Sequence, residues 1–284
     1  MIKLKYILIG VLGVVLHFMA AEANAQMQVY SQGEIVATIV SGVADSVTYA
    51  PIPAPKSQVL NEGGVGGAAP TAEQAIDMGL SVKWAPWNVG ASKAEENGAY
   101  FAWGEINAKE TYDWGTYYWM AEGQSDWTNI NKYQIADGQF SADWYAKDQF
   151  IGDGKSTLES EDDAATANWG SGWRMPTMAE LEELMNEDNC TWTWVENYHG
   201  SDLNGYEVKS KTTAGLLFLP AAGDRRDSDL DYAGYYGYYW SSELGSGNAG
   251  YARYLYFRSS YRTSSSLYSR GRGFSVRAVA VSAE

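Results

Sequence analysis

The hydrophobic residues of this chain mostly form short runs or alternate with polar residues, a pattern typical of β-strands. The runs that predict strands lie at residues 82–84, 100–103, 216–219, 238–241, 252–257 and 274–279. Helical spacing is confined to two short segments. The pattern therefore predicts an α+β domain with few helices, short strands and long irregular loops.

Two capping signatures mark the expected helices. Thr71 precedes residues 72–78 with Gln74 three positions on, and Thr177 precedes the second segment with Glu180 three positions on. In such a capping box the two residues satisfy backbone amides at the start of the helix. The second helix is the better defined because it has one apolar face, formed by Leu181, Leu184 and Met185.

Residues 1–25 have the pattern of a secretory signal peptide. Two lysines precede an uncharged run at 6–20, and Ala-Asn-Ala at 23–25 supplies a small-x-small cleavage site. We therefore expect export to the periplasm, the cell surface or the medium. No second apolar run of about 20 residues follows, so no transmembrane segment is expected after signal removal.

Two segments separate the signal from the main domain. Residues 26–49 predict a small β segment, which is too small to be stable alone and could pair with a partner subunit. Residues 50–70 are rich in proline and glycine and predict a linker. The main domain is expected at 71–284.

The net charge limits the classes of partner that are expected, and the cysteine content excludes internal disulfides. The formal net charge is −15, which repels phosphate backbones and excludes nucleic acid as an expected partner. Cys190 is the only cysteine, so the chain forms no intramolecular disulfide. Against this acidic balance, residues 253–277 carry six arginines and no acid.

Candidate catalytic groups are few. His199 is the only histidine after signal removal and is expected in a turn, so catalysis by a Cys–His or Ser–His pair is not favoured. A glycan hydrolase needs two suitably spaced carboxylates. The runs that could supply them are Glu159, Glu161, Asp162 and Asp163, and Glu180, Glu182 and Glu183. Acidic runs of this kind are typical of a solvent-exposed surface. We therefore expect that the protein is not an enzyme.

One cation remains an open alternative. Asp153, Asp162 and Asp163 offer the hard oxygen ligands that Ca²⁺ prefers, although their spacing matches no EF-hand. A structural calcium ion is therefore kept as an alternative, and no other cofactor is expected.

The stretch from about 232 to 272 has the composition of a recognition surface. It holds ten tyrosines together with serine, glycine and arginine, the residue types that paratopes use. In the expected strand at 252–257, Leu255 and Phe257 share one face, and tyrosine occupies the other. The expected ligand contacts are Tyr235, Tyr236, Tyr238, Tyr239, Tyr251, Arg253, Tyr254, Tyr256, Arg258, Tyr261 and Arg262.

Several segments carry a family resemblance. They are Leu-Ser-Val-Lys-Trp-Ala at 80–85, Gly-Ala-Tyr-Phe-Ala-Trp-Gly-Glu at 98–105, Trp-Gly-Ser-Gly-Trp-Arg-Met-Pro-Thr at 169–177, Tyr-Trp-Ser-Ser at 239–242 and Gly-Phe-Ser-Val-Arg at 273–277. Over residues 71–281 the chain resembles the Fibrobacter succinogenes major paralogous domain family. The resemblance implies a C-type-lectin-like fold of the formylglycine-generating-enzyme branch. The scaffold residues it implies are Trp173, Arg174, Trp240, Leu255, Phe257, Phe274 and Val276.

The chain departs from relatives of that fold in two respects. The oxidase branch holds copper with a pair of cysteines, whereas this chain has only Cys190, so we do not expect that activity. The Glu-Pro-Asn and Trp-Asn-Asp signatures of calcium-dependent lectins are also missing.

The stretch from 232 to 272 is similar, in addition, to the variable region of proteins diversified by retroelements. In such regions adenines of a template copy are randomised, and asparagine codons become codons for Tyr, Ser, Asp, Gly or Arg. The resemblance implies a variable binding region on a fixed scaffold.

These expectations combine into one leading function, an exported bacterial protein that binds a protein or glycan ligand at a cell surface without catalysis. A structural or fimbria-like envelope component, assembled through residues 26–49, is the first alternative. A carboxylate-dependent glycan hydrolase is the second.

Overall fold

The chain divides into two compact units, residues 1–56 and residues 57–284. The computed structural model describes residues 57–62, 64–136 and 152–281, and the strands at 14–18, 26–31, 34–40, 145–146 and 149–150. All the described helices belong to the second unit.

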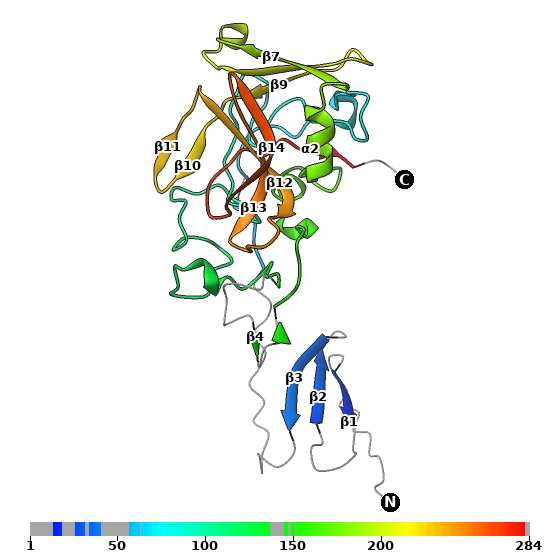
Figure 1. The fold of residues 1–284 in the computed structure, drawn as a ribbon, viewed down its shortest axis with the longest axis vertical. Coiled ribbons are helices and arrows are strands. Elements are labelled where there is room, and N and C mark those ends of the chain that lie inside the picture. The colour runs from blue at the N-terminus through cyan, green and yellow to red at the C-terminus, as the bar shows by residue number, and fades with distance from the viewer. Residues whose placement is uncertain are drawn as a thin grey trace, which may run out of the picture. The chain divides into compact units, whose positions relative to one another are not determined.

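The first unit contains a three-stranded antiparallel sheet in the order β1–β2–β3 (Figure 1). Its strands are β1 (Val14–Phe18), β2 (Gln26–Ser31) and β3 (Glu34–Val40). β2 and β3 fall in the segment where the sequence predicts short strands. β1 lies inside the segment interpreted as a signal peptide, so removal of that segment would leave the β2–β3 hairpin.

The second unit is built from several small antiparallel sheets. The three-stranded sheets are β7 (Cys190–Val195), β8 (Gly205–Ser210) and β9 (Leu216–Pro220), and β12 (Tyr236–Leu244), β13 (Tyr251–Arg258) and β14 (Tyr261–Ser269). The two-stranded sheets are β4 (Tyr145–Ala146) with β5 (Gln149–Phe150), β6 (Trp173–Arg174) with β15 (Val279–Ala280), and β10 (Asp224–Arg226) with β11 (Asp229–Asp231). The unit is therefore mixed and sheet-rich.

Three of the six predicted strands are confirmed, at 216–219, 238–241 and 252–257. Residues 82–84 instead form isolated bridges through Trp84, and residues 100–103 form one through Phe101. Residues 274–279 form isolated bridges through Phe274 and Ser275, and only Val279 lies in a strand, β15. The backbone around these residues forms hydrogen bonds to several separate segments, and these bonds do not make a continuous β-ladder. For example, the amide of Val89 donates to Val276 and that of Ala85 to Ala278.

The described part of the chain contains two α-helices, α1 (Ala164–Trp169) and α2 (Met178–Met185). Its 3-10 turns are η1 (Ala72–Gln74), η2 (Trp127–Asn129), η4 (Ser160–Asp162) and η5 (Tyr198–Gly200). α2 confirms the second predicted helix and its capping box. The amide of Glu180 donates to Oγ1 of Thr177 over 3.3 Å, and the amide of Thr177 donates to Oε2 of Glu180 over 2.8 Å.

The helix predicted at 72–78 is wrong beyond its first turn. The Thr71 amide does donate to Oε1 of Gln74, but Ile76 and Trp84 then exchange two backbone hydrogen bonds. This bridge pulls the chain into an extended conformation. α1 is not predicted by the sequence because six residues give too little periodicity, although Asp163 caps it by accepting from two of its amides.

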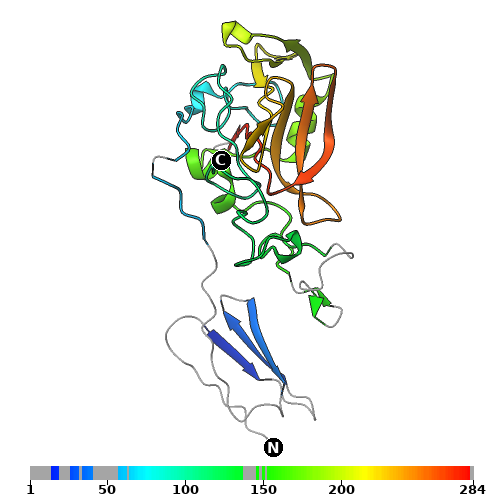
Figure 2. The ribbon, with the colours of Figure 1, turned by 90° about the vertical axis from the view of Figure 1, so that its left-hand side faces the viewer.

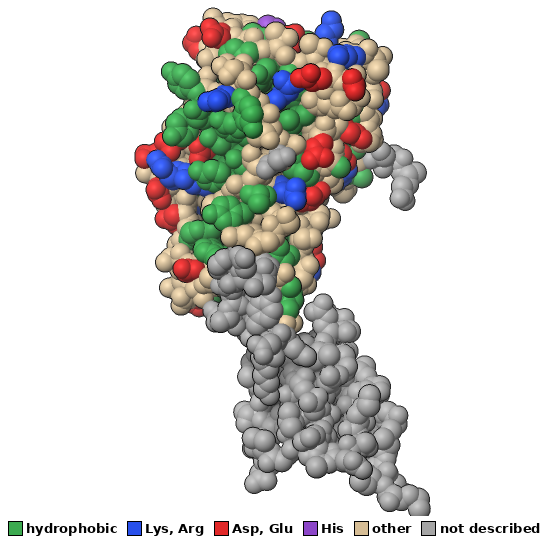
Figure 3. Space-filling model, viewed as in Figure 1, with side chains coloured by type: hydrophobic (Ala, Val, Ile, Leu, Met, Phe, Trp, Pro, Cys, Tyr) green, Lys and Arg blue, Asp and Glu red, His purple; other side chains and the backbone are tan. Residues whose placement is uncertain are grey.

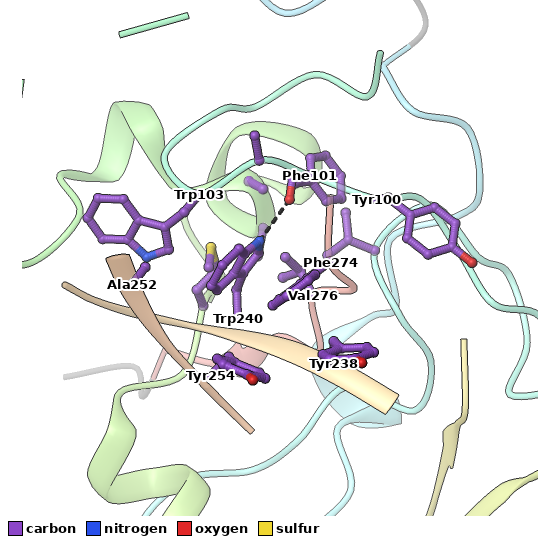
Figure 4. Close-up of a cluster of buried hydrophobic side chains, with 14 of the residues drawn as sticks. Tyr100, Phe101, Trp103, Tyr238, Trp240, Ala252, Tyr254, Phe274 and Val276 are labelled. Carbon is purple, nitrogen blue, oxygen red and sulfur yellow. Dashed lines mark hydrogen bonds between the residues drawn. The ribbon is translucent and has the colours of Figure 1, made fainter. Parts of the chain in front are cut away.

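The β12–β13–β14 sheet lies between two hydrophobic clusters. The first is built around Trp103, Trp240 and Phe274, and Figure 4 shows part of it. The second contains Leu184 of α2 and Phe257 of β13. α2 contacts all three strands from this second side and lies behind the sheet in Figure 2.

The chain joins the second unit earlier than the expected domain start at 71. The hydroxyl of Tyr118 donates to the carbonyl of Ser57, and Gln58 Nε2 donates to the carbonyl of Gly104. The segment expected to be linker is therefore part of the domain from Ser57 onward. None of the helices in the described ranges has the length and hydrophobicity that a membrane span requires.

Candidate ligand-binding surface

One face of the β12–β13–β14 sheet is formed largely by tyrosine. Because side chains alternate along a strand, Tyr236 and Tyr238 of β12 point to the same side as Tyr254 and Tyr256 of β13. Tyr268 of β14 lies on this side too, with its ring centroid 6.0 Å from that of Tyr254. The C-terminal stretch thus builds a nearly continuous layer of phenol rings.

Exposure rises across this layer from the core to the outer turns. Tyr238 and Tyr254 are only 8% and 6% exposed, whereas Tyr261, Tyr232 and Tyr235 are 49%, 54% and 71% exposed. We call the outer part the tyrosine surface, defined as Tyr232, Tyr235, Tyr236, Tyr256, Arg258 and Tyr261. Figure 3 shows hydrophobic side chains, tyrosine included, gathered between the β10–β11 hairpin and the tip of the β13–β14 hairpin.

The rings of the tyrosine surface support one another. The centroids of Tyr232 and Tyr236 are 4.8 Å apart, those of Tyr236 and Tyr256 are 5.7 Å apart, and those of Tyr256 and Tyr261 are 6.2 Å apart. The Arg258 guanidinium lies 5.9 Å from the Tyr261 ring centroid, within cation–π range. Each ring restricts its neighbour, so the surface is partly organised before any ligand arrives.

Tyr239, one of the expected contacts, is instead a core residue. It points to the other side of β12, where its ring stacks on Phe257 with centroids 5.7 Å apart. Its hydroxyl donates to the carbonyl of Pro220 over 2.7 Å. Burial raises the pKa of Tyr239 to about 12. The side chain holds β12 to β9 and cannot meet a ligand in this structure.

Tyr238 and Tyr254 also belong to the core, although they point to the side that was expected to be open. Tyr254 lies 5.1 Å from Phe274 between centroids and 6.0 Å from Trp240. Figure 4 shows Tyr238 and Tyr254 beside Phe274 and Trp240. The predicted alternation along β13 is confirmed, but neighbouring segments cover the inner half of the tyrosine face.

The remaining expected contacts lie outside the tyrosine surface. Nη2 of Arg262 is 2.7 Å from Oε1 of Glu187, and its guanidinium lies over the Trp192 ring, on the other side of the sheet. Arg253 is half-buried, and Tyr251 is exposed at the start of β13. These residues do not form one contiguous site with Tyr256 and Arg258.

The residues implied as scaffold are almost entirely inside. Those with buried side chains are Trp173, Trp240, Leu255, Phe257, Phe274 and Val276. Trp240 Nε1 donates to the carbonyl of Phe101 over 2.8 Å, the dashed line in Figure 4. Arg174 is half-buried and makes two hydrogen bonds to Glu180, of 2.8 and 2.5 Å. Burial alone raises the pKa of Glu180, but the hydrogen bonds from Arg174 and Thr177 lower it below its usual value.

Two arginines of the basic stretch are buried, which the sequence did not indicate. Arg270 donates to the Tyr117 hydroxyl and to the carbonyls of Tyr133, Ala249 and Lys132. Arg277 donates to Asn88 Oδ1 and to the carbonyls of Ala85 and Phe218. Both cations are part of the scaffold, so only part of the basic stretch is exposed on the surface.

The densest carboxylate cluster is neutralised by a lysine. Ligand atoms of Glu159, Glu161 and Asp162 lie within 4.8 Å of one another, as a metal site requires. Nζ of Lys132, however, is 2.6 Å from Glu159, 3.4 Å from Glu161 and 2.6 Å from Asp162. The ammonium group occupies the position that a cation would take, so the geometry does not favour a metal there.

The other acids of the calcium hypothesis have partners within the chain. Asp153 accepts hydrogen bonds from the amides of Tyr133, Gln134 and Lys155. Asp163 caps α1 and accepts from the amide of Met175. Each carboxylate thus has a structural role of its own.

His199 lies in a strained turn on the surface. Its φ is +49°, its ring stacks on Tyr198, and Nδ1 is 2.9 Å from Oε1 of Glu95. The contact between His199 and Glu95 lies apart from the carboxylate clusters described above. Comparison of the chain with protein-family models, with curated proteins and with solved structures gave no match.

Proposed function

We propose that this chain is an exported, non-catalytic binding protein whose tyrosine surface contacts a protein or glycan ligand at a cell surface. One observation carries the proposal: phenol rings from the turn before β12, from β12, from β13 and from the start of β14 are exposed or half-buried. They contact one another in series beside Arg258. An exposed aromatic patch of this kind is a liability for a soluble protein unless it is used.

The chemistry of the patch suits recognition. Tyrosine offers a large ring and a hydroxyl at a small cost in side-chain entropy, and arginine offers a planar set of donors. Contact between Tyr236, Tyr256 and Tyr261 lowers the entropy that binding would otherwise cost. The net charge of −15 argues against nucleic acid as the ligand.

We propose further that the second unit has the C-type-lectin-like fold and that its C-terminal stretch is a retroelement-diversified region. In support, the residues that match the family scaffold are buried, and the interleaved residues of the tyrosine surface are exposed or half-buried. The neighbouring DNA tests the second point. A near-copy of the last 130 or so bases, differing at adenines and lying beside a reverse-transcriptase gene, would support it. Absence of both would make the stretch an ordinary surface of its family.

The binding proposal is tested with a triple variant, Tyr256→Ala, Arg258→Ala and Tyr261→Ala. Tyr254 is left intact because its burial would confuse loss of binding with loss of stability. Binding of the fluorescently labelled protein to a panel of intact cells is measured. Loss of a central hot spot worth about 2 kcal/mol weakens binding about thirtyfold. The affinity of the triple variant for cells should therefore fall at least thirtyfold, with its melting temperature nearly unchanged.

The matched control changes a comparable area elsewhere. Leu216→Ala and Lys209→Ala alter exposed residues on the β8–β9 pair, and binding should persist. Unchanged binding in the triple variant would refute the proposed site.

The envelope-component alternative has one observation in its favour. Removal of the signal peptide would leave the β2–β3 hairpin, in which both strands are edges to which another strand could add. Deletion of residues 26–49 separates the two functions: assembly would be lost under this alternative, whereas ligand binding would be retained under the leading proposal.

A further inference from the structure

We propose that a pocket beside the end of β14 is a subsite for one neutral sugar residue of a glycan. The inference rests on the proposed binding function and names a ligand class for a second part of the same C-terminal stretch. The pocket has a volume of about 500 Å³. That lies within the range of small-molecule sites, roughly 300–1,000 Å³.

Three separate segments converge to form this pocket, which we call the β14 pocket. They are the loop at 112–114, the turn of the β10–β11 hairpin at 226–227 and the C-terminal stretch from Tyr251 to Arg272. Tyr268 and Tyr261 are seven residues apart on β14, which is about 23 Å at the usual rise of a strand. The pocket is thus separate from the tyrosine surface but on the same sheet.

Aromatic side chains supply the walls. Trp114, Tyr251 and Tyr268 line the pocket. The Tyr268 ring is held between Arg272, whose guanidinium lies 5.3 Å from its centroid, and Phe274, whose centroid is 5.6 Å away. Trp114 packs edge-on against Tyr117 at 5.4 Å. Held rings of this kind suit the flat, weakly polar face of a pyranose.

The charges of the lining cancel. Arg226 and Arg272 contribute two positive charges, and Asp113 and Asp227 contribute two negative charges. Each guanidinium is also paired with a carboxylate outside the lining, Arg226 with Asp231 at 3.0 Å and Arg272 with Asp224 at 3.2 Å, so neither is free to neutralise an anionic ligand. An anionic ligand would meet the two carboxylates, and a cationic ligand would meet the two guanidinium groups. A neutral ligand rich in hydroxyl groups can use donors and acceptors of both kinds without burying a net charge.

Several polar groups at the pocket have no partner within the described part of the chain. Trp114 Nε1 and the hydroxyls of Tyr251 and Tyr268 take part in no hydrogen bond there, and Arg272 makes one side-chain hydrogen bond, from Nη1 to Asp224. These groups are free to satisfy sugar hydroxyls. Aromatic walls with unused donors at their edges therefore point to a carbohydrate and not to an apolar ligand.

The test is titration of the full-length protein with neutral oligosaccharides of glucose, mannose, galactose and N-acetylglucosamine. Oligogalacturonate serves as the anionic probe and chitosan oligomers as the cationic one. Tryptophan fluorescence and calorimetry measure binding. At least one neutral series should bind saturably, and the charged probes should bind at least tenfold more weakly.

Two variants locate the site. Trp114→Phe removes the indole N–H and part of the wall. The double variant Tyr251→Ser with Arg226→Ser changes two exposed side chains and removes one solvent-exposed ion pair, between Arg226 and Asp231. Each should weaken neutral-sugar binding at least tenfold with little change in melting temperature. Leu216→Ala with Lys209→Ala, on the exposed side of the β8–β9 pair, is the control and should leave sugar binding unchanged.

The outcomes distinguish the two proposals. The sugar subsite is overturned if no neutral sugar binds, if a charged probe binds more strongly, or if the pocket variants bind sugar normally. In each of these cases, loss of cell binding in the Tyr256/Arg258/Tyr261 variant still supports the proposed function. The opposite result is also possible to recognise. If the pocket variants weaken sugar binding but the Tyr256/Arg258/Tyr261 variant binds cells normally, the proposed contact site is overturned and the sugar subsite is supported.

Discussion

At the scale of single residues, Arg270 shows how this fold accommodates charge. Its guanidinium is fully buried and forms no ion pair within the described ranges, but it donates to four oxygens and lies 5.0 Å from the Trp103 ring centroid. Carbonyl acceptors and an aromatic face thus replace the carboxylate that a buried cation usually needs. A lysine could not copy this planar arrangement of donors.

Asp224 is the buried carboxylate with the clearest consequence for pH dependence. Burial raises its pKa from 3.8 to about 6, and Arg272, 3.2 Å away, only partly offsets that effect. The folded protein therefore binds this proton more tightly than the unfolded chain does. The stability that protonated Asp224 contributes is complete below the unfolded pKa of 3.8 and is lost as the pH rises through about 6.

Asp224→Asn should remove that dependence. The difference in free energy of unfolding, wild type minus variant, should fall by about 2 kcal/mol between pH 4 and pH 7. The shift of about two pKa units corresponds to about 3 kcal/mol in all, and part of it is already lost at pH 4, just above the unfolded pKa of 3.8. Urea unfolding of both proteins at one-unit intervals measures it. Taking the difference cancels the titration of other groups, and a flat difference would contradict the prediction.

Residue type alone could not predict which members of the C-terminal stretch are accessible. Alternation correctly separates Leu255 and Phe257 from Tyr254 and Tyr256. It does not reveal that Trp240 and Phe274 cover Tyr254, because that depends on the register between β12 and β13 and on how the segment at Phe274 packs against them. Arg270 has three of its four hydrogen-bond partners more than 100 positions earlier, so the sequence pattern cannot distinguish it from the exposed Arg258.

At the scale of elements, the sequence predicts a helix or strand correctly where the element is stabilised by its own residues. α2 has a capping box and an apolar face, and β13 places Leu255 and Phe257 on one face of the sheet and Tyr254 and Tyr256 on the other. The segments around Trp84 and Phe101 do not form ladders, because each bridges to partners scattered along the chain. Tyr256 and Arg258 lie on β13, an element of the first kind, and both were predicted as contacts. Tyr232 lies in the turn before β12 and was not predicted.

The cap of α2 gives a prediction at this scale. Thr177→Ala removes the hydroxyl that accepts from the Glu180 amide, and loss of an N-cap costs about 1 kcal/mol. Glu182→Ala, on the exposed side of the same helix, should change stability by less than about 0.5 kcal/mol. Guanidinium unfolding compares the two, and equal effects would mean that the cap adds nothing.

At the scale of the whole molecule, the segment from Ser57 to Pro70 decides where the domain begins. Its proline and glycine content predicts a linker, yet Gln58 makes three hydrogen bonds to the domain. Its amide nitrogen donates to the carbonyl of Gly104 and to Asp162, and its Oε1 accepts from the amide of Ile106. The amide of Val65 also donates to Asn168. A composition rule cannot detect such contacts, because they involve partners up to about a hundred residues away.

Two truncated chains test this boundary. A chain that begins at Ser57 keeps all these contacts and should unfold like the second unit of the full protein. A chain that begins at Thr71 loses the Gln58 hydrogen bonds and leaves buried partners unsatisfied, at about 1 kcal/mol each. Its stability should fall by about 2–3 kcal/mol and its melting temperature by roughly 5–10 °C. Calorimetry on both chains measures the difference. If both melt alike, residues 57–70 are a linker after all, and the domain is the shorter one that the sequence predicts.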